Sequence, residues 1–222
     1  MERKTYIIVV AGGNGSRMGS ATPKQFLEIG GVPILQRTLE HLAEAAPGAR
    51  AVTVLPKAWF QTWKDLCIKH SFNMPQILVE GGLTRFHSVQ NALRKVPDGA
   101  IAAIHDGVRP FVSAALVREM LSRMEKERAV IPVVPVTDTL KNADPLGPDP
   151  DRSRILAAQT PQVFRSEDIK AAYGQAFSTS FTDDASVAKA YGIPLSYIGG
   201  ERRNIKITAP EDLELAELFL LR

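Results

Sequence analysis

The stretch that decides the fold runs from Tyr6 to Lys24 and reads Tyr-Ile-Ile-Val-Val-Ala-Gly-Gly-Asn-Gly-Ser-Arg-Met-Gly-Ser-Ala-Thr-Pro-Lys. Its opening run is apolar without alternation, which is typical of a parallel strand buried on both faces. The glycines that follow let a ligand approach the backbone, so that successive N–H groups can point at phosphate oxygens. Arg17 adds a planar fork of donors and Lys24 a compact charge. The stretch therefore predicts a strand followed by a loop that binds a reactive triphosphate.

Length and composition favour one domain, residues 1–222, with a good-sized core because 45% of the residues are hydrophobic. The formal net charge is only +3 and the cations are scattered along the chain, so we expect no nucleic-acid partner. The single cysteine, Cys67, excludes an internal disulfide and fits a reducing compartment. The apolar run near the N-terminus is too short for a signal or a membrane span. We therefore expect a cytoplasmic protein with no membrane partner.

Beyond the glycine loop, short apolar runs alternate with stretches of helical periodicity. This alternation predicts an α/β fold, a three-layer α/β/α sandwich around a mainly parallel, Rossmann-like sheet, with ligands at the carboxyl ends of the strands. The expected strands cover residues 6–10, 51–55, 76–79, 100–104, 129–134, 195–198 and 204–207. The expected helices cover residues 33–45, 57–69, 85–96, 114–126, 166–177, 183–191 and 210–220.

One stretch interrupts the alternation. Residues 142–154 contain three prolines and a glycine, and long excursions from compact domains are usually functional or disordered. The stretch is either a solvated surface loop or a protruding β-hairpin arm flanked by residues 138–141 and 155–158. The residue pattern favours neither interpretation.

The glycine loop does not match either of two commoner nucleotide-binding motifs. The spacing of Gly13, Gly15 and Gly19 resembles the loop of short-chain dehydrogenases. However, the second expected strand ends in Leu55-Pro56-Lys57, without an acidic residue to hold a ribose, and no Tyr-x-x-x-Lys pair occurs. The sequence also lacks a Gly-x-x-x-x-Gly-Lys-Ser/Thr run, which excludes the P-loop class.

A second group of polar residues, His105 to Phe111, follows the expected strand 100–104. A carboxylate at the carboxyl end of a strand, beside a phosphate loop, suits a sugar hydroxyl or Mg²⁺, and this favours Asp106 as a ligand contact. The alternative is an ion pair between Asp106 and Arg109 without a ligand. We expect His105 to be a packed, hydrogen-bonded histidine, and the spacing of the histidines suggests no zinc site.

Three further motifs have weaker signals on their own. Gly81 and Gly82 precede Thr84, which we expect to cap a helix whose Ser88 could contact a base edge. Residues 182–186 resemble a helix start, for which capping and dipole complementarity would be a sufficient explanation. Lys206 interrupts a β-rich run and is either directed at a phosphate or extended along apolar surface.

Taken together, these motifs resemble one family closely, the 2-C-methyl-D-erythritol 4-phosphate cytidylyltransferases of the non-mevalonate isoprenoid pathway. The matching motifs occur in family order and span nearly the whole chain. They are Ala11-Gly12-Gly13-x-Gly15-x-Arg17-Met18, Pro23-Lys24-Gln25-Phe26, Asp106-x-x-Arg109-Pro110, Gln159-Thr160-Pro161-Gln162, Thr182-Asp183-x-Ala185-Ser186 and Asn204-Ile205-Lys206-Ile207-Thr208. The first two are shared with many nucleotidyltransferases, whereas the Thr-Asp-x-Ala-Ser and Asn-Ile-Lys motifs are more specific.

The resemblance implies a reaction. The phosphate of methylerythritol phosphate attacks the α-phosphorus of CTP and gives 4-diphosphocytidyl-2-C-methyl-D-erythritol and pyrophosphate. The resemblance also implies Mg²⁺ or another divalent cation, with protein ligands that remain unassigned. Finally, it implies a homodimer in which an arm of about residues 137–158 completes the substrate site of the partner.

The resemblance further implies roles for individual residues. The catalytic set consists of Arg17, Lys24, Arg152 and Lys206. The substrate-binding set consists of Asp106, Arg109 and Thr182. The nucleotide-binding set consists of Ala11, Gly12, Gly13, Gly15, Gly82, Arg85 and Ser88.

Two departures and two alternative functions stay open. Leu83 stands where relatives usually have an acidic residue, and Arg154 competes with Arg152, which we favour for its spacing from Thr160. One alternative is a ribitol 5-phosphate cytidylyltransferase, which shares the glycine loop and the Pro-Lys-Gln-Phe motif. The other is a nucleotide-binding sensor without catalysis, which would tolerate the loss of Lys24.

Overall fold

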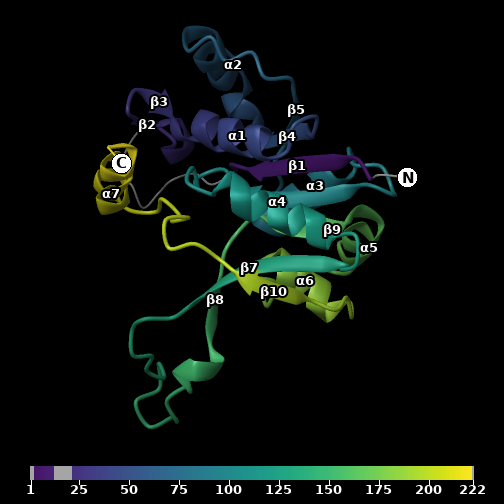
Figure 1. Ribbon diagram of the computed structural model, residues 1–222, viewed down its shortest axis with the longest axis vertical. Coiled ribbons are helices and arrows are strands. Elements are labelled where there is room, and N and C mark those ends of the chain that lie inside the picture. Colours follow the sequence, from purple (N-terminus) through teal and green to yellow (C-terminus); the bar gives the residue numbers. More distant parts are fainter. Residues whose placement is uncertain (1–2, 13–21, 222) are drawn as a thin grey trace.

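The computed structural model describes residues 3–12 and 22–221, so the predicted site residues Gly13, Gly15 and Arg17 lie outside the described part of the chain. Within those described ranges, the strands form an eight-stranded sheet in the order β10-β7-β9-β6-β1-β4-β5, with β8 paired to β7 (Figure 1). The strands are β1 (Thr5–Val10), β4 (Arg50–Leu55), β5 (Gln76–Glu80), β6 (Ile101–Asp106), β7 (Ala129–Pro135), β8 (Leu156–Ala158), β9 (Gln162–Arg165) and β10 (Ser196–Gly199). A separate hairpin joins β2 (Glu28–Ile29) and β3 (Val32–Pro33).

The helices match most of the predicted periodic stretches. They are α1 (Ile34–Ala45), α2 (Phe60–Lys69), α3 (Arg85–Leu93), α4 (Ala114–Arg123), α5 (Ser166–Ala172), α6 (Asp184–Ala190) and α7 (Pro210–Leu220). The predicted cap of α3 is confirmed, since the side chain of Thr84 accepts a hydrogen bond from the N–H of His87. Three predicted helices were too long. Helix α3 stops before Pro97, which disfavours helical backbone ahead of it, and α5 stops before Gly174. Helix α4 ends at Arg123, three residues before its predicted end.

The sheet is mainly parallel, as predicted. Strands β5, β4, β1 and β6 pair in parallel, and so do β10 and β7. Strand β9 is antiparallel to both of its neighbours, β6 and β7. The sequence analysis missed β9, because its four residues contain only two apolar side chains, Val163 and Phe164, and such a short run gives no periodicity signal.

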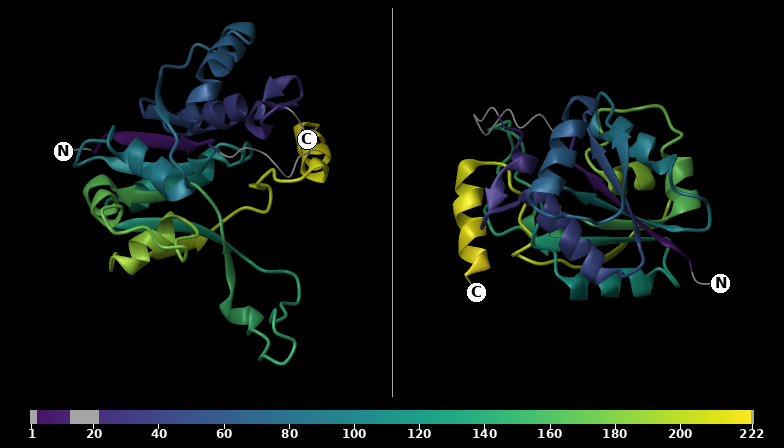
Figure 2. Two further views of the ribbon diagram at one scale, coloured as in Figure 1. Left: turned by 180° about the vertical axis from the view of Figure 1, so that it is seen from behind. Right: turned by 90° about the horizontal axis from the view of Figure 1, so that it is seen from above.

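Helices cover both faces of the sheet, and the predicted three-layer sandwich is confirmed (Figure 2). Tyr6 and Ile8 of β1 pack in one hydrophobic cluster with residues of α3, α5 and α6. Ile7 and Val9 pack in the other with residues of α1, α2 and α4. Burial on both faces explains why the apolar run of β1 does not alternate.

The predicted strand at residues 204–207 was wrong. This segment has neither helical nor strand structure and belongs to neither sheet. The N–H of Ile207 donates to the carbonyl of Val108, in the loop after β6, and the N–H of Asn204 donates to Glu201. The segment therefore bonds to loops, with no neighbouring strand to complete a ladder.

The predicted hairpin arm is not confirmed as a pair of long strands. Val133–Pro135 of β7 pairs with Leu156–Ala158 of β8, but residues 138–141, which flank the arm in one of the two interpretations, form no strand. Residues 136–155 form an irregular loop with one short 3₁₀ turn, η4 (Arg152–Arg154), and Figure 1 shows this segment extending away from the sheet.

A buried histidine fixes the carboxyl end of β6. His105 is completely buried, with Nδ1 3.1 Å from the hydroxyl of Thr160 and Nε2 3.0 Å from the carbonyl oxygen of Arg109. The same Thr160 hydroxyl accepts a hydrogen bond of 3.0 Å from the N–H of Asp106. The prediction of a packed structural histidine is confirmed, and its contacts hold the backbone that carries Asp106.

Titration of His105 should make folding stability depend on pH. Burial lowers the pKa of its imidazole from the usual 6.5 to about 4, so the folded protein keeps it neutral while the unfolded chain takes up a proton below pH 6.5. The free energy of unfolding is expected to decrease by about 3 kcal/mol as the pH falls from 6.5 to 4, from this group alone. Urea unfolding at several pH values between about 7.5 and 4 measures the decrease.

The matched variant for this prediction is His105→Gln, whose amide keeps hydrogen-bonding capacity but does not titrate. We expect it to be less stable than the parent at neutral pH and to lose less stability over the same pH range. A parallel decline in parent and variant would assign the pH dependence to other groups.

Candidate active site

The motif residues gather around a cavity of about 390 Å³ at the carboxyl ends of strands β1, β5 and β6. Open parallel sheets bind their ligands at this edge, which agrees with the expectation from the sequence. The described residues that line the cavity are Val10, Ala11, Gly12, Lys24, Gln25, Gly82, Leu83, Thr84, Arg85, Ser88, Asp106, Val108 and Lys206. The fold therefore brings together most of the predicted catalytic and nucleotide-binding residues among those that the structure describes.

The backbone of Ala11, which follows β1 and lines the cavity, is fixed by two hydrogen bonds. The side-chain amide of Gln25 donates a hydrogen bond of 2.9 Å to the carbonyl of Ala11, and the N–H of Ala11 donates to the carbonyl of Val54. Gln25 is buried and follows Lys24 in the 3₁₀ turn η2 (Lys24–Phe26). The Pro-Lys-Gln-Phe motif is thus linked through Gln25 to the backbone of Ala11, which directly follows β1.

The turn between β5 and α3 is closed by Ser88. Its hydroxyl accepts a hydrogen bond of 3.0 Å from the N–H of Gly82. A Cβ added at Gly82 would lie 2.4 Å from the Cβ of His87, so only glycine fits this close approach. Leu83, next to it, is 98% exposed at the cavity. The conformation of this turn therefore depends on both Gly82 and Ser88.

Three cations surround the carboxylate of Asp106. Its Oδ2 lies 2.9 Å from Lys206 Nζ and 3.5 Å from Arg109 Nε, and its Oδ1 lies 3.4 Å from Arg85 Nε. Burial by itself raises the pKa of a carboxyl, but the charges of Arg85, Lys206 and Arg109 outweigh it and hold the pKa of Asp106 well below its usual range. The ion pair with Arg109 that the sequence suggested does form, as one of three.

Arg85 forms an ion pair with the buried carboxylate of Asp184, and the sequence analysis did not predict this pair. The two terminal nitrogens of Arg85 donate to the two oxygens of Asp184, at 2.9 and 2.7 Å. Asp184 is the first residue of α6, whereas the predicted cap is made by Asp183, whose carboxylate accepts from the N–H of Ser186. Capping needs only one acid, and Asp183 supplies it. The second acid, Asp184, is the feature of the sequence that could have indicated a cationic partner.

Three predicted site residues, Thr182, Arg152 and Arg109, do not line this cavity. Thr182 is exposed and lies directly before the cap of α6. Arg152 lies in the loop of residues 136–155, where it donates a hydrogen bond to the carbonyl of Thr137. Arg109 is placed behind Asp106 and donates to the carbonyl of Asn204 at 2.7 Å, while Lys24 Nζ lies 3.3 Å from the carbonyl oxygen of Ile207.

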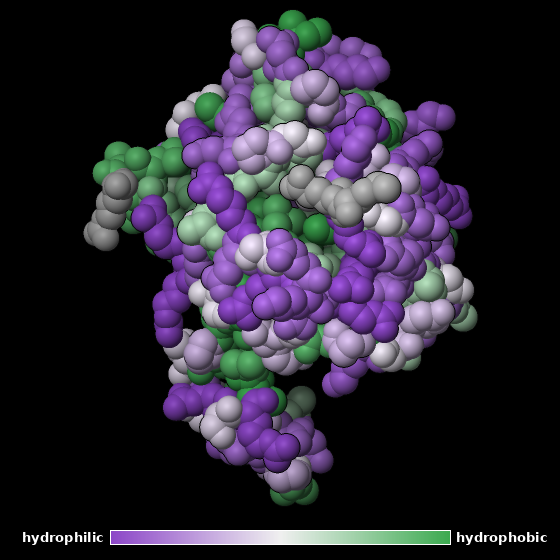
Figure 3. Space-filling view, turned by 45° about the vertical axis from the view of Figure 1, so that its right-hand side comes forward, coloured by the Kyte–Doolittle hydropathy of each residue, from purple (hydrophilic) through white to green (hydrophobic). Residues whose placement is uncertain are grey.

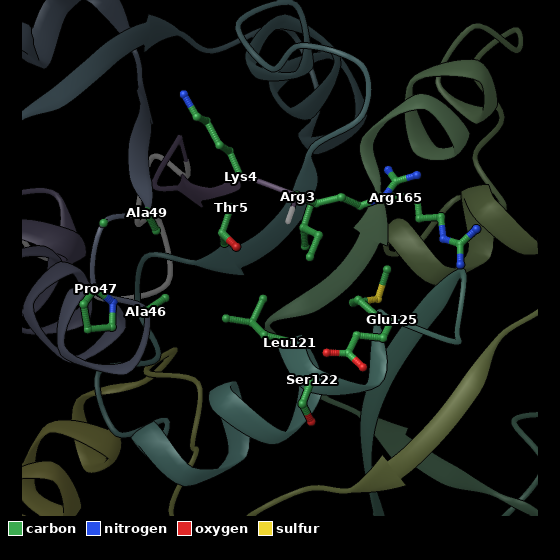
Figure 4. Close-up of a pocket in the computed structure, with 13 residues that line it drawn as sticks. Arg3, Lys4, Thr5, Ala46, Pro47, Ala49, Leu121, Ser122, Glu125 and Arg165 are labelled. Carbon is green, nitrogen blue, oxygen red and sulfur yellow. The ribbon is translucent and has the colours of Figure 1, made fainter. Parts of the chain in front are cut away.

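Another cavity, of about 1030 Å³, lies at the opposite edge of the sheet, at the amino ends of β1 and β6 (Figure 4). Its wall carries charges of both signs, including Arg3, Glu125 and Arg165. Arg3 is already paired with Glu167 at 2.7 Å, and no predicted site residue lies there. The chemistry of the motifs therefore favours the smaller cavity around Asp106.

The protein side chains do not form a metal cage. The described residues contain no group of three or more histidine, cysteine, aspartate or glutamate side chains that could hold a metal ion. Asp106, the carboxylate in the cavity, has cations beside both of its oxygens. In this described part of the chain, no helix has both the length and the apolar character needed to cross a membrane.

Comparisons with known proteins agree with the motifs. The family model described as IspD, 2-C-methyl-D-erythritol 4-phosphate cytidylyltransferase, matches residues 5–222. The enzyme of that name from Bacteroides thetaiotaomicron is 45% identical over 218 residues, 98% of this chain and 100% of the relative. The one from Porphyromonas gingivalis W83 is 45% identical over 222 residues and covers 99% of each chain.

Solved structures give the same result. The 4-diphosphocytidyl-2C-methyl-D-erythritol synthase from Anaerococcus prevotii superposes with a TM-score of 0.83 at 28% identity, covering 100% of this chain and 97% of that one. The 2-C-methyl-D-erythritol 4-phosphate cytidylyltransferase from Thermus thermophilus superposes with a TM-score of 0.76 at 29% identity, covering 99% and 100%. The predicted family is confirmed, and this chain belongs to the 2-C-methyl-D-erythritol 4-phosphate cytidylyltransferases.

Proposed function

We propose that this chain transfers CMP from CTP to 2-C-methyl-D-erythritol 4-phosphate in the cavity around Asp106 and releases pyrophosphate. The observation that carries the proposal is the charge of the cavity wall. Among the described lining residues, Lys24, Arg85 and Lys206 are cations and Asp106 is the one carboxylate. A wall with this surplus of positive charge suits two polyanions that must react with each other.

The reaction needs no side chain to act as a base. At pH 7 the attacking phosphate is already mostly dianionic, because its second pKa is about 6. The obstacle is the repulsion between the two substrates and the charge that develops at the α-phosphorus of CTP. Positioning and fixed positive charge solve this problem in phosphoryl transfer generally. We assign this stabilisation to Lys24 and, on the family resemblance, to Arg17.

The two substrates would occupy neighbouring parts of the cavity. We assign the nucleotide to the backbone of Ala11, Gly12 and Gly82, with Gly13 and Gly15 assigned by resemblance alone. The ionised carboxylate of Asp106 can accept hydrogen bonds from the hydroxyls of methylerythritol, while Lys206 faces its phosphate. Arg109 supports this arrangement from behind Asp106.

Mg²⁺ would enter this site with the nucleotide. The side chains of the described residues do not fit a resident metal site, since the carboxylate of Asp106 is already paired with cations. Mg²⁺ is commonly held in such sites by substrate phosphates and few protein ligands. We therefore propose that the triphosphate of CTP supplies the oxygens that hold it.

We further propose that the protein acts as a cytoplasmic homodimer in which the loop of residues 136–155 reaches the partner's cavity. Arg152 and Thr182 do not line the cavity of their own chain. Exposed apolar side chains gather where the loop leaves the body, and Leu156 is 46% and Tyr197 55% exposed there (Figure 3). The free thiol of Cys67, whose pKa burial raises to about 11, fits a reducing compartment.

Release of pyrophosphate tests the reaction directly. The parent enzyme is assayed with CTP, Mg²⁺ and either methylerythritol phosphate or ribitol 5-phosphate. We expect turnover with methylerythritol phosphate and little with ribitol 5-phosphate, since the family match spans residues 5–222. Turnover of ribitol 5-phosphate alone would refute the proposed acceptor, and binding of CTP without turnover of either would favour the sensor.

Lys24 is expected to act on the transition state more than on substrate binding. Lys24→Ala should lower kcat by about a hundredfold or more, as the loss of an oxyanion-hole donor does, while the Kd for CTP changes little. Steady-state kinetics and calorimetry measure the two quantities. Lys57→Ala removes an exposed lysine from the turn after β4 and is the matched control. Equal turnover of Lys24→Ala and parent would exclude this role.

Mixed dimers test the exchange of the loop. Lys24→Ala and Arg152→Ala should each be inactive alone. If Arg152 serves the partner's cavity, a dimer of one Lys24→Ala subunit and one Arg152→Ala subunit has one intact site and should recover about half of the parent activity.

Two differently tagged subunits allow the mixed dimer to be purified, and sedimentation reports its size. Arg154→Ala takes the place of Arg152→Ala as the control and should remain active alone. A monomeric parent, or a mixed dimer without activity, would contradict loop exchange.

A further inference from the structure

Asp184 is a completely buried carboxylate without an assigned role in the reaction. It accepts hydrogen bonds from both terminal nitrogens of Arg85 and one of 2.5 Å from the hydroxyl of Tyr173. Burial and the neighbouring Asp184 raise the pKa of Tyr173 well above its usual value, so the hydroxyl stays a donor. These donors fix the orientation of the carboxylate, and Arg85 balances its charge.

The backbone around Asp184 is fixed to the sheet. The side chain of Gln162, in β9, accepts a hydrogen bond of 2.7 Å from the N–H of Ala185 and donates one of 2.8 Å to Asp183. Tyr173 directly follows α5 and stacks on Phe86 of α3, with ring centroids 4.7 Å apart. Asp184 therefore has little freedom to follow Arg85 if Arg85 moves.

Arg85 links Asp184 to the cavity around Asp106. With its terminal nitrogens on Asp184, the guanidinium presents Nε to Asp106 at 3.4 Å. Lys206 approaches the other oxygen of Asp106 at 2.9 Å. The bidentate pair is the stronger of the two contacts of Arg85, because both of its hydrogen bonds are parallel and charge-assisted.

We propose that Asp184 is a positioning residue for cytidylyl transfer, which holds Arg85 away from full pairing with Asp106 and so keeps that carboxylate available to the acceptor substrate. This inference rests on the proposed function of the cavity. Without the charge of Asp184, the guanidinium of Arg85 turns to Asp106 as its remaining anionic neighbour. It then competes with Lys206 and with the hydroxyls of the polyol phosphate for the same oxygens.

The test separates the KM for the acceptor from kcat and from the KM for CTP. Asp184→Asn should raise the KM for methylerythritol phosphate by about tenfold or more, because Arg85 loses its charged partner. Tyr173→Phe keeps the ion pair and removes one hydrogen bond, so it should raise the same KM by about two- to fourfold. The family resemblance assigns Arg85 to the nucleotide, but its ion pairs are with Asp184 and Asp106. The KM for CTP should therefore change less than the KM for the acceptor in both variants.

A second arginine–aspartate pair provides the matched control. Arg128 donates to both oxygens of Asp168, at 2.8 and 2.5 Å, and neither residue lines the Asp106 cavity. Asp168→Asn makes the same chemical change and should leave both KM values unchanged. Thermal unfolding of all variants is measured alongside, and Tyr173→Phe carries the test if Asp184→Asn does not fold.

The outcomes are distinct. If Asp184 only stabilises the fold, each variant preparation contains less active enzyme. The kcat per mole of protein then falls while the KM for the acceptor stays at the parent value. This result would overturn the proposal. Failure of the proposed function is seen in the parent enzyme, before any variant is compared. If the parent uses ribitol 5-phosphate instead, the KM for that acceptor becomes the readout, with the same expected increase.

Discussion

The carboxylate of Asp106 lies at the end of a strand that is buried along its whole length. Arg109 approaches it from the turn that directly follows this strand, and Arg85 and Lys206 approach it from two other parts of the chain. A buried anion with three cationic neighbours stays ionised, and the cations are in turn held by the anion. Each of them would repel the others without it. The cavity can therefore concentrate positive charge for two phosphorylated substrates and still remain a folded, hydrogen-bonded structure.

The rest of the structure supports this one cluster. His105 and Thr160 hold the backbone of Asp106. Asp184 holds Arg85, and the carbonyl of Asn204 accepts from Arg109. These groups are buried, so that each unsatisfied polar atom would cost free energy, and their pairing fixes one arrangement of the site. The positive charge that faces the substrates is thus preorganised by residues that never contact them.

Much of the fold follows from local patterns in the sequence. The continuous apolar run of β1 indicated burial on both faces, and the glycines after it indicated a loop for a nucleotide. Thr84 was placed as a cap from its position before a periodic stretch. The antiparallel strand β9 was missed, and residues 204–207 were assigned to a strand that does not exist. Both errors concern segments whose partners in space are far away in the sequence.

The sequence by itself determined the family, the order of most elements and the residue types of the site, because burial, capping and backbone freedom leave local signatures. Only the tertiary structure decided which charges meet. Lys206 reaches Asp106 from a segment one hundred positions away, and Arg85 reaches Asp184 across a similar separation. No periodicity reports such pairs, since they depend on how the layers pack against each other. Arg152 lies outside the cavity of its own chain and donates to the carbonyl of Thr137.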